Sequence, residues 1–243
     1  MGCKSCLNIR TLSHRLNQGR LGNQMFQIAA VYGIATKNNI KPIIPNWAYI
    51  NHFNLSNSII GTPRGQQINE QGYAYQNIEV GKGGILSGYF QSYKYFEQVQ
   101  NVVRWFFQPK RPKFQQQQNT TALHIRRTDY LSGNCQEVLG VDYYNAAIEQ
   151  IKPTRLIVFS DDIIWAKENI KPGIEIEYST RNELEDLELM SRCDSHIIAN
   201  STFSWWGAYL ANSKRVISPS KWFKGDCANH DIKDLNLPHW KLI

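Results

Sequence analysis

The chain has 243 residues, of which 42% are hydrophobic and 12% aromatic, and its formal net charge is +7. This length and composition are typical of a globular protein with one large or two small domains, and they exclude a disordered chain. No apolar run approaches the roughly 20 residues of a membrane span, and because the first 20 residues are polar and basic we expect no secretory signal.

Charge is distributed unevenly along the chain. Residues 1–118 carry 13 Lys or Arg and three acids, whereas residues 119–243 carry 14 basic and 17 acidic residues. We therefore predict two domains, 1–118 and 119–243, with the Pro- and Gln-rich residues 108–119 as the linker. The basic part could meet a polyanion, an anionic membrane face or a phosphorylated substrate, or be merely a soluble surface.

The five cysteines, Cys3, Cys6, Cys135, Cys193 and Cys227, are scattered and odd in number. This favours free thiols in a reducing compartment over a disulfide framework. Cys3 and Cys6 form a CxxC without a second pair, so no zinc site is predicted. The opening Met-Gly-Cys-Lys-Ser-Cys departs from an acylation signal at Cys6. We expect a cytoplasmic protein, with lipidation and peripheral membrane contact as an open alternative.

The N-terminal part begins with a weakly alternating stretch, which predicts a strand within residues 1–18. A glycine-bearing turn at residues 19–27 then opens an apolar helix at residues 28–35. Its glycines permit positive φ and close approach of a ligand, although an ordinary strand-to-helix turn would look the same. The turn is not the GxGxxG of a dinucleotide site.

The remainder of this part is harder to assign. Residues 37–80 have no clear pattern, and residues 99–107 predict a helix. The aromatic stretch at residues 88–96 suits sugar rings as well as a core.

Strands and helices alternate regularly from residue 121 onward. Strands are predicted at residues 121–125, 155–159, 174–178, 196–199 and 215–218. Helices are predicted at residues 142–151, 163–170, 182–193 and 203–212. This alternation predicts βαβ units and a parallel sheet of about five strands. Right-handed crossovers place the carboxyl ends of the strands on one edge, where open α/β sheets bind ligands.

Two arginines follow the first of these strands. The paired guanidinium groups of Arg126 and Arg127 match phosphate oxygens bidentately. The alternative is that one of them pairs with Asp129 and only holds the loop. Asp161 and Asp162, after the second strand, could form a metal site, a helix N-cap, or acceptors for a ribose or base. Because the arginines can offset the charge of a diphosphate, we predict a nucleotide diphosphate without a metal ion.

A polar turn follows the fourth strand and leads into a helix. Asn200, Ser201 and Thr202 lie where free backbone N–H groups and the positive end of the helix dipole favour a phosphate. The alternative is that Ser201 or Thr202 only caps the helix.

Five stretches together resemble the galactoside α-1,2-fucosyltransferase family. In that family's order they are GRLGNQMFQ, GYFQSYKYF, HIRRTDYL, FSDDIIW and IIANSTFSWWGAYL. The resemblance implies a GT-B architecture, in which two Rossmann-type domains face a cleft. It also implies GDP-L-fucose as the donor, inversion at the anomeric carbon, and no metal or other cofactor. The polar residues 13–18 and the short N-terminal part depart from the family's pattern and leave the acceptor more open than the donor.

The same resemblance implies roles for individual residues. Arg126 and Arg127 would lie by the GDP phosphates, with His124 and Asp161 near the nucleoside. The remaining donor contacts would come from Ser201, Thr202 and Phe203 at the pyrophosphate, and from Gly22 and Asn23 of the other domain.

The predicted function is transfer of L-fucose from GDP-fucose to a hydroxyl of a glycan, O2 of a terminal galactose, by a single inverting displacement. The arginines and the helix N-terminus would stabilise the departing charge. A general base could be Glu70, Glu79, Glu97 or Asp129, or could be dispensable.

Two other functions remain open from the sequence. One is a catalytically silent nucleotide- or glycan-binding protein. The other is a nucleic-acid binder, which the scattered charges and the lack of a known motif disfavour. The oligomeric state is not predicted.

Overall fold

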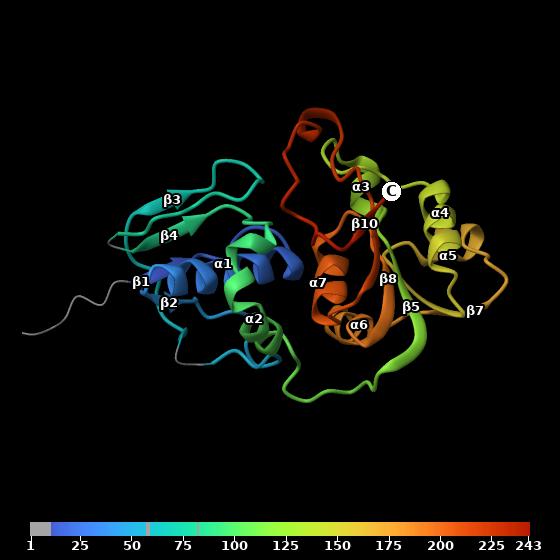
Figure 1. Cartoon of the computed structure of the whole chain (residues 1–243), viewed down its shortest axis with the longest axis horizontal. Coiled ribbons are helices and arrows are strands. Elements are labelled where there is room, and N and C mark those ends of the chain that lie inside the picture. Colours follow the sequence, from blue (N-terminus) through green and yellow to red (C-terminus); the bar gives the residue numbers. More distant parts are fainter. Residues whose placement is uncertain (1–10, 57–58, 82) are drawn as a thin grey trace, which may run out of the picture. The chain divides into compact units, whose positions relative to one another are not determined.

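The computed structural model describes residues 11–56, 59–81 and 83–243, and the chain divides into two compact units, Met1–Phe107 and Gln108–Ile243 (Figure 1). Each unit contains a sheet whose paired strands are parallel. The structure therefore confirms the predicted α/β class. Cys3, Cys6 and the acylation-like start lie outside the described residues.

The sheet of the first unit has the strand order β2-β1-β4-β3. Its strands are β1 (Thr11–His14), β2 (Lys41–Ile43), β3 (Gln67–Asn69) and β4 (Gly84–Ser87). The first confirms a strand within residues 1–18. Each strand has only three or four residues, which is too short for a recognisable alternation of apolar and polar side chains. This is why residues 37–80 carried no clear pattern.

Helix α1 (Leu21–Lys37) begins in the glycine turn and is buried along most of its length. Gly33 permits a close backbone contact, because a Cβ atom there would lie 2.0 Å from the Tyr95 carbonyl oxygen. The segments that follow β4 are η2 (Tyr93–Tyr95), η3 (Glu97–Val99) and α2 (Gln100–Phe106), the last confirming the helix predicted at residues 99–107. In the aromatic stretch 88–96, Phe90, Tyr95 and Phe96 are buried in the core.

The sheet of the second unit has six strands in the order β10-β9-β8-β5-β6-β7. They are β5 (Gln117–Ile125), β6 (Arg155–Ser160), β7 (Glu175–Tyr178), β8 (Cys193–Ile197), β9 (Arg215–Ser218) and β10 (Lys241–Leu242). The five predicted strands are confirmed, and β10 adds a sixth at the edge. β8 starts three residues before the predicted residue 196, because the preceding helix ends at Met190 and not at Cys193.

Helices cover both faces of this sheet (Figure 1). They are α3 (Thr128–Ser132), α4 (Val141–Ile151), α5 (Ile163–Asn169), α6 (Glu183–Met190), α7 (Thr202–Leu210) and the 3-10 helix η4 (Gly225–Cys227). Alternate residues of β5 divide between the two faces: Leu123 packs in the core cluster with α4 and α5, and Ala122 in the cluster with α6. A strand buried on both faces reads as a continuous apolar run, which is why these strands were predictable.

The segment predicted as a linker is attached to the second unit. The backbone N–H groups of Lys113 and Phe114 donate to Glu188 Oε1 at 2.6 and 2.9 Å, and β5 begins already at Gln117. The units therefore meet at residues 107/108, eleven residues before the predicted boundary at 118/119. The Pro- and Gln-rich composition indicated a boundary in this region. It could not indicate that the buried Glu188 carboxylate of α6 anchors the segment to the second unit.

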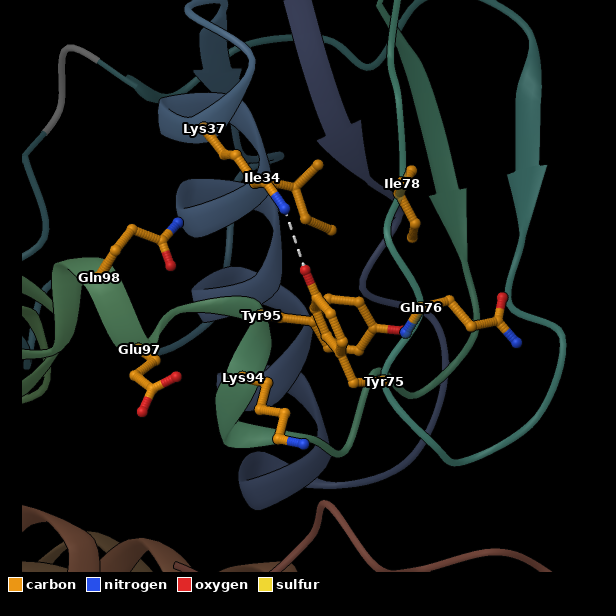
Figure 2. A pocket seen from close by; sticks show the side chains of 9 residues that line it. All are labelled: Ile34, Lys37, Tyr75, Gln76, Ile78, Lys94, Tyr95, Glu97 and Gln98. Carbon is orange, nitrogen blue, oxygen red and sulfur yellow. Dashed lines mark hydrogen bonds between the residues drawn. The ribbon is translucent and has the colours of Figure 1, made fainter.

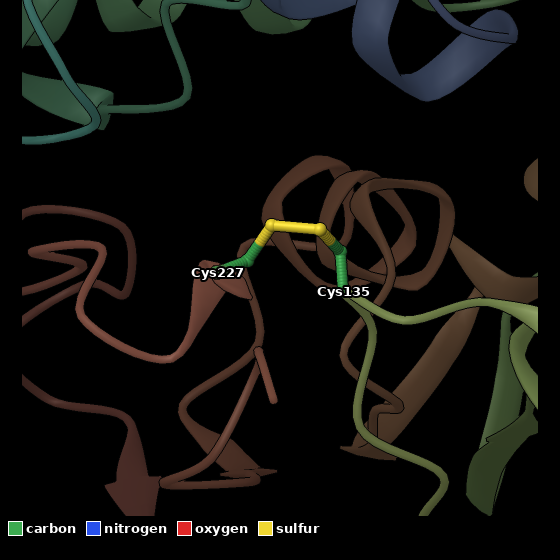
Figure 3. The surroundings of a disulfide bond; sticks show 2 residues. All are labelled: Cys135 and Cys227. Carbon is green, nitrogen blue, oxygen red and sulfur yellow. A yellow bond between two sulfur atoms is a disulfide. The ribbon is translucent and has the colours of Figure 1, made fainter. Parts of the chain in front are cut away.

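A disulfide joins Cys135 to Cys227 in the second unit (Figure 3). This corrects the expectation of free thiols, which among the described cysteines holds only for buried Cys193. The two half-cystines are 92 residues apart, and the paired loops that bring them together are linked by the Lys224 N–H donating to the Cys135 carbonyl at 2.8 Å. No sequence spacing signals such a contact.

Among the described residues, none of the helices has both the length and the apolar character that crossing a membrane requires.

Candidate active site

The two arginines lie directly after β5, in a segment that continues into the first turn of α3 and is here called the arginine loop (residues 126–129). The Arg126 guanidinium forms ion pairs with Asp129 at 2.7 Å and with Asp161 at 3.2 Å. Asp161 reaches this loop because β5 and β6 are neighbours, with Ile125 opposite Ser160 at their carboxyl ends. Adjacent parallel strands thus bring two stretches of sequence, 35 residues apart, to one edge of the sheet.

Asp161 anchors the arginine loop. Its carboxylate accepts hydrogen bonds from the N–H groups of Arg127 (2.9 Å) and Thr128 (3.1 Å) and from the Thr128 hydroxyl (2.5 Å). Burial by itself would raise the pKa of Asp161, but the Thr128 and Arg127 hydrogen bonds and the charge of Arg126 lower it below its usual value. Asp161 is therefore ionised and fully engaged in holding the loop.

Arg127 is held between a carboxylate and an aromatic ring. Its Nε lies 3.4 Å from Asp162, an ion pair without hydrogen-bond geometry, and its guanidinium carbon lies 4.1 Å from the centroid of the Trp165 ring. Asp162 also caps α5 by accepting the Trp165 N–H at 3.1 Å. Of the roles predicted for Asp162, the structure shows the helix N-cap.

A second set of polar groups, the hydroxyl turn (residues 200–202), lies between β8 and α7. Ser201 is the N-cap residue of α7, but its side chain makes no capping hydrogen bond. The turn is held from outside: the Asn200 amide donates to the carbonyls of Glu137 and Trp222, both at 2.8 Å. Those carbonyls belong to the two loops that the Cys135–Cys227 disulfide connects.

Tyr130 joins the arginine loop to the hydroxyl turn. Its ring centroid is 5.6 Å from the Arg126 guanidinium carbon, and its hydroxyl donates to the Asn200 carbonyl at 3.1 Å. The flanking elements also meet, because the His124 ring of β5 lies 5.6 Å from the Phe203 ring of α7. The predicted phosphate-binding groups from the ends of β5 and β8 therefore lie together at one edge of the second sheet.

His124 is a buried, neutral side chain at this edge. Burial, followed by the nearby Arg126 charge, lowers the pKa of His124 to about 3. Its Nδ1 atom is buried and has no hydrogen-bond partner among the residues that the structure describes. A neutral imidazole with an uncommitted nitrogen can accept or donate one hydrogen bond to a ligand, depending on its tautomer.

Asp186 of α6 is a half-buried acid that the sequence did not single out. Its carboxylate is hydrogen-bonded to the Ser179 hydroxyl, which follows β7, and burial raises the pKa of Asp186 to about 6. The stretch ELEDLELM contains four acids, and nothing in its spacing distinguishes Asp186 and the buried Glu188 from the two others.

The remaining predicted residues belong to the first unit. In the glycine turn, Gly19 has φ +72°, a positive value of the kind predicted for these glycines. Gly22 is buried in the first turn of α1. Asn23 Oδ1 accepts a hydrogen bond from the Gln91 amide at 3.0 Å. Asn23, in the first turn of α1, is thus held by a side chain of the segment that follows β4.

The three candidate bases of the first unit differ in environment. Glu70 accepts the N–H groups of Tyr89 and Phe90 at 2.7 and 2.9 Å, and burial raises its pKa above the usual value despite these hydrogen bonds. Glu79 and Glu97 are exposed. Glu70 directly follows β3, so it lies at the carboxyl edge of the first sheet. Within the described ranges, no three His, Cys, Asp or Glu side chains are grouped so as to hold a metal ion.

Similarity to known proteins identifies the family. The sequence profile of Glycosyl transferase family 11 matches residues 66–243. The chain belongs to this family. The stretches HIRRTDYL and IIANSTFSWWGAYL, which form the arginine loop and the hydroxyl turn, fall within the matched residues.

Relatives in the family come from bacteria and animals. The O-antigen biosynthesis glycosyltransferase WbnK of Escherichia coli is 29% identical over 86% of this chain and 94% of its own. An alpha-1,2-colitosyltransferase of Escherichia coli is 27% identical over 87% of this chain and 92% of its own. Galactoside alpha-(1,2)-fucosyltransferase 2 of Oryctolagus cuniculus is 24% identical over 82% of this chain and 66% of its own.

Solved structures show the same fold at low sequence identity. Fucosyltransferase NodZ from Bradyrhizobium aligns with a TM-score of 0.59 and 11% identity, over 85% of this chain and 94% of its own. A NodZ alpha-1,6-fucosyltransferase crystal soaked with GDP-fucose aligns with a TM-score of 0.56 and 10% identity, over 91% and 97%. The likeness confirms the GT-B type of fold that the sequence motifs implied.

Proposed function

We propose that this family 11 glycosyltransferase moves L-fucose from GDP-fucose to O2 of a terminal galactose in a glycan, with inversion. One observation carries the proposal: Tyr130 joins Arg126 to the hydroxyl turn, so two guanidinium groups and a helix N-terminus meet at one sheet edge. Such an arrangement suits a diphosphate leaving group. The names of the galactoside fucosyltransferase relatives, and the fold shared with a structure soaked with GDP-fucose, support this choice of donor and acceptor.

In this proposal the second unit binds the donor. Arg126, Arg127 and the N–H groups around Ser201 and Thr202 hold the diphosphate, and His124 offers its free ring nitrogen to the nucleoside. Asp161 and Asp162 act through the arginines, which makes them positioning residues. Asp129 leaves Arg126 as the diphosphate arrives, because that ion pair is the exposed one.

The reaction is a single displacement at the anomeric carbon. The acceptor oxygen bonds to C1 of fucose from the face opposite GDP, while the bond from C1 to the phosphate oxygen breaks and its electron pair leaves with GDP. Negative charge grows on the diphosphate in the transition state, where preorganised arginines and N–H groups stabilise it most. The acceptor proton passes to a base or to the departing phosphate.

We propose Glu70 as that base. Its raised pKa moves it toward the range in which a carboxylate accepts protons effectively near neutral pH. It follows β3 at the sheet edge where α/β folds bind ligands, and the neighbouring Tyr73 and Tyr89 rings, stacked 6.3 Å apart, offer apolar faces to a sugar.

A second donor is favoured by a specific observation. The alpha-1,2-colitosyltransferase of Escherichia coli matches this chain over 92% of its own length, so GDP-colitose is the competing donor to test. The linkage to O2 is common to both choices.

The proposal is tested by incubating the full chain with GDP-fucose or GDP-colitose and a panel of galactose-terminated acceptors. We expect release of GDP and a product whose linkage, determined by NMR, is α-1,2. GDP binding without any transfer across the panel would favour a silent binding protein instead. Activity should survive EDTA, and a loss that Mn²⁺ restores would return Asp161 and Asp162 to a metal-binding role.

A further inference from the structure

The first unit contains a pocket of about 560 Å³ whose lining includes the exposed candidate base Glu97 but none of the residues to which the proposed transfer assigns a role (Figure 2). It is lined by the C-terminal half of α1, by the segment around Tyr75, and by η2 and η3. This volume falls in the range of small-molecule sites, roughly 300–1,000 Å³. Ile34 lies twelve residues beyond Gly22, a rise of about 18 Å along the helix, so the pocket is separate from the glycine turn.

Two tyrosine rings, together with the side chains of Ile34 and Ile78, form the apolar part of the pocket. Tyr75 and Tyr95 lie with their ring centroids 5.0 Å apart and inclined at 55°. Tyr95 is only 2% exposed, and its hydroxyl accepts the Gln76 N–H at 3.3 Å. Both rings are therefore held in place before any ligand arrives.

Lys37 fixes the second ring from the side of α1. Its ammonium donates to the Tyr75 hydroxyl at 3.1 Å and to Asn77 Oδ1 at 2.7 Å, and it lies 5.9 Å from the Tyr75 ring centroid (Figure 2). These two hydrogen bonds occupy Lys37 with neutral oxygen atoms. The ammonium group therefore stabilises the pocket wall, and binding an anion would require it to give up one of these hydrogen bonds.

The rest of the lining is polar and of mixed charge. Lys94 and Glu97 bring opposite charges, while Gln98 donates its amide nitrogen to the Gly33 carbonyl at 2.8 Å and contributes an amide oxygen. An apolar ligand would desolvate the charged groups without compensation, and a phosphate would face the Glu97 carboxylate. A saccharide fits both features, because its ring faces pack on aromatic side chains and its hydroxyls both donate and accept hydrogen bonds.

We propose that this pocket binds a saccharide unit of the acceptor glycan, at a distance from the hydroxyl that reacts. Tyr75 follows Glu70 by five residues, so their Cα atoms are at most about 18 Å apart along an extended chain. A glycan of a few residues spans that distance. The inference rests on the proposed function for the identity of the ligand, but the pocket itself binds saccharide without the donor.

The test measures binding and transfer separately on the full chain. Saturation-transfer NMR without donor compares lactose with the galactose-terminated lacto-N-tetraose. We expect the tetrasaccharide to bind the wild type more tightly than lactose does, and Tyr75→Ala to bind it about tenfold more weakly, through the loss of ring contact. Lys94→Ala should weaken it in the same direction, whereas Lys41→Ala, an exposed lysine of β2 outside the pocket, should not.

Kinetics then shows whether the pocket serves the acceptor. In Tyr75→Ala the KM for lacto-N-tetraose should rise toward that for lactose, with kcat, the KM for lactose and GDP affinity unchanged. Wild-type affinity for the tetrasaccharide in both Tyr75→Ala and Lys94→Ala would overturn the proposal, and so would competition by inorganic phosphate. If Tyr75→Ala fails to fold, Lys94→Ala, at a half-buried position, and Gln98→Ala, at an exposed one, decide the matter. Tyr75-dependent tetrasaccharide binding without any sugar transfer would refute the proposed function and leave the pocket standing.

Discussion

Replacing Asp161 by Asn separates two roles for this carboxylate, that of a loop anchor and that of a group that touches the ligand. The wild-type side chain accepts three hydrogen bonds, from two N–H groups and the Thr128 hydroxyl, and forms an ion pair with Arg126. An amide has a single acceptor oxygen, and its NH₂ group would face one of the backbone N–H donors. Asp161→Asn therefore loses at least one hydrogen bond to a charged acceptor as well as the ion pair.

The size of the effect follows from these contacts. Each hydrogen bond to a charged group is worth about 1.5–3 kcal/mol, and the Asp161 side chain is only 17% exposed, so solvent screens the interactions weakly. We expect Asp161→Asn to lower the free energy of unfolding by about 3 kcal/mol and Tm by roughly 10 °C. GDP affinity should fall about tenfold, because the arginines lose their fixed positions.

The assay combines thermal unfolding followed by circular dichroism with calorimetric titration of GDP. Asp142→Asn, at an exposed position in the first turn of α4, is the matched control and should change both quantities little. If Asp161→Asn kept the wild-type Tm but lost GDP binding, the carboxylate would act on the ligand directly, and the anchoring argument would be refuted.

Three other outcomes are expected. Arg126→Ala should raise the Kd for GDP roughly 10- to 100-fold by calorimetry, and an unchanged Kd would contradict the phosphate role. The double variant Cys135→Ser/Cys227→Ser should unfold in urea with about 4–5 kcal/mol less stability, from closure of the 92-residue loop, and become indifferent to reductant; equal midpoints would show that the crosslink contributes nothing. His124 and His196, buried with pKa values lowered to about 3 and about 4, stay neutral when folded but protonate below pH 6.5 when unfolded. The free energy of unfolding should therefore decrease as the pH is lowered from 7 to 4.5, by up to about 1.4 kcal/mol per pH unit for each histidine. A free energy of unfolding that does not change over this range would be inconsistent with the burial of these side chains.

The second unit was predictable because its signals are local. Each strand is a short apolar run followed by a polar end and a helix, so the chain order of β5 to β9 and the residues at their carboxyl ends could be read from the sequence. Because parallel strands joined by right-handed crossovers end at the same edge of a sheet, the sequence alone predicted that Arg126 and Asn200 lie at one edge. The strands of the first unit are too short to leave such a pattern.

Contacts between distant residues were not predictable. Asp161 could have bound a metal ion, a ribose or a protein loop, and only the positions of Thr128 and Arg127 show that the loop occupies it. The Cys135–Cys227 pairing and the tie between Glu188 and the segment after residue 107 likewise depend on which loops meet in space. Spacing along the chain carries no information on any of these.

The exposed ion pair between Arg126 and Asp129 has a consequence for ligand selection. The Asp129 side chain is 46% exposed, whereas that of Arg126 is 17% exposed, so the acid is the partner that solvent can take up when another anion competes. An anion with a single phosphate replaces one carboxylate by a group of similar charge and gains little from the exchange. If the arginine loop holds a diphosphate as proposed, the ligand brings a second anionic group for Arg127 in the same encounter. Competition from Asp129 would then disfavour monophosphates and inorganic phosphate in a mixture of anions.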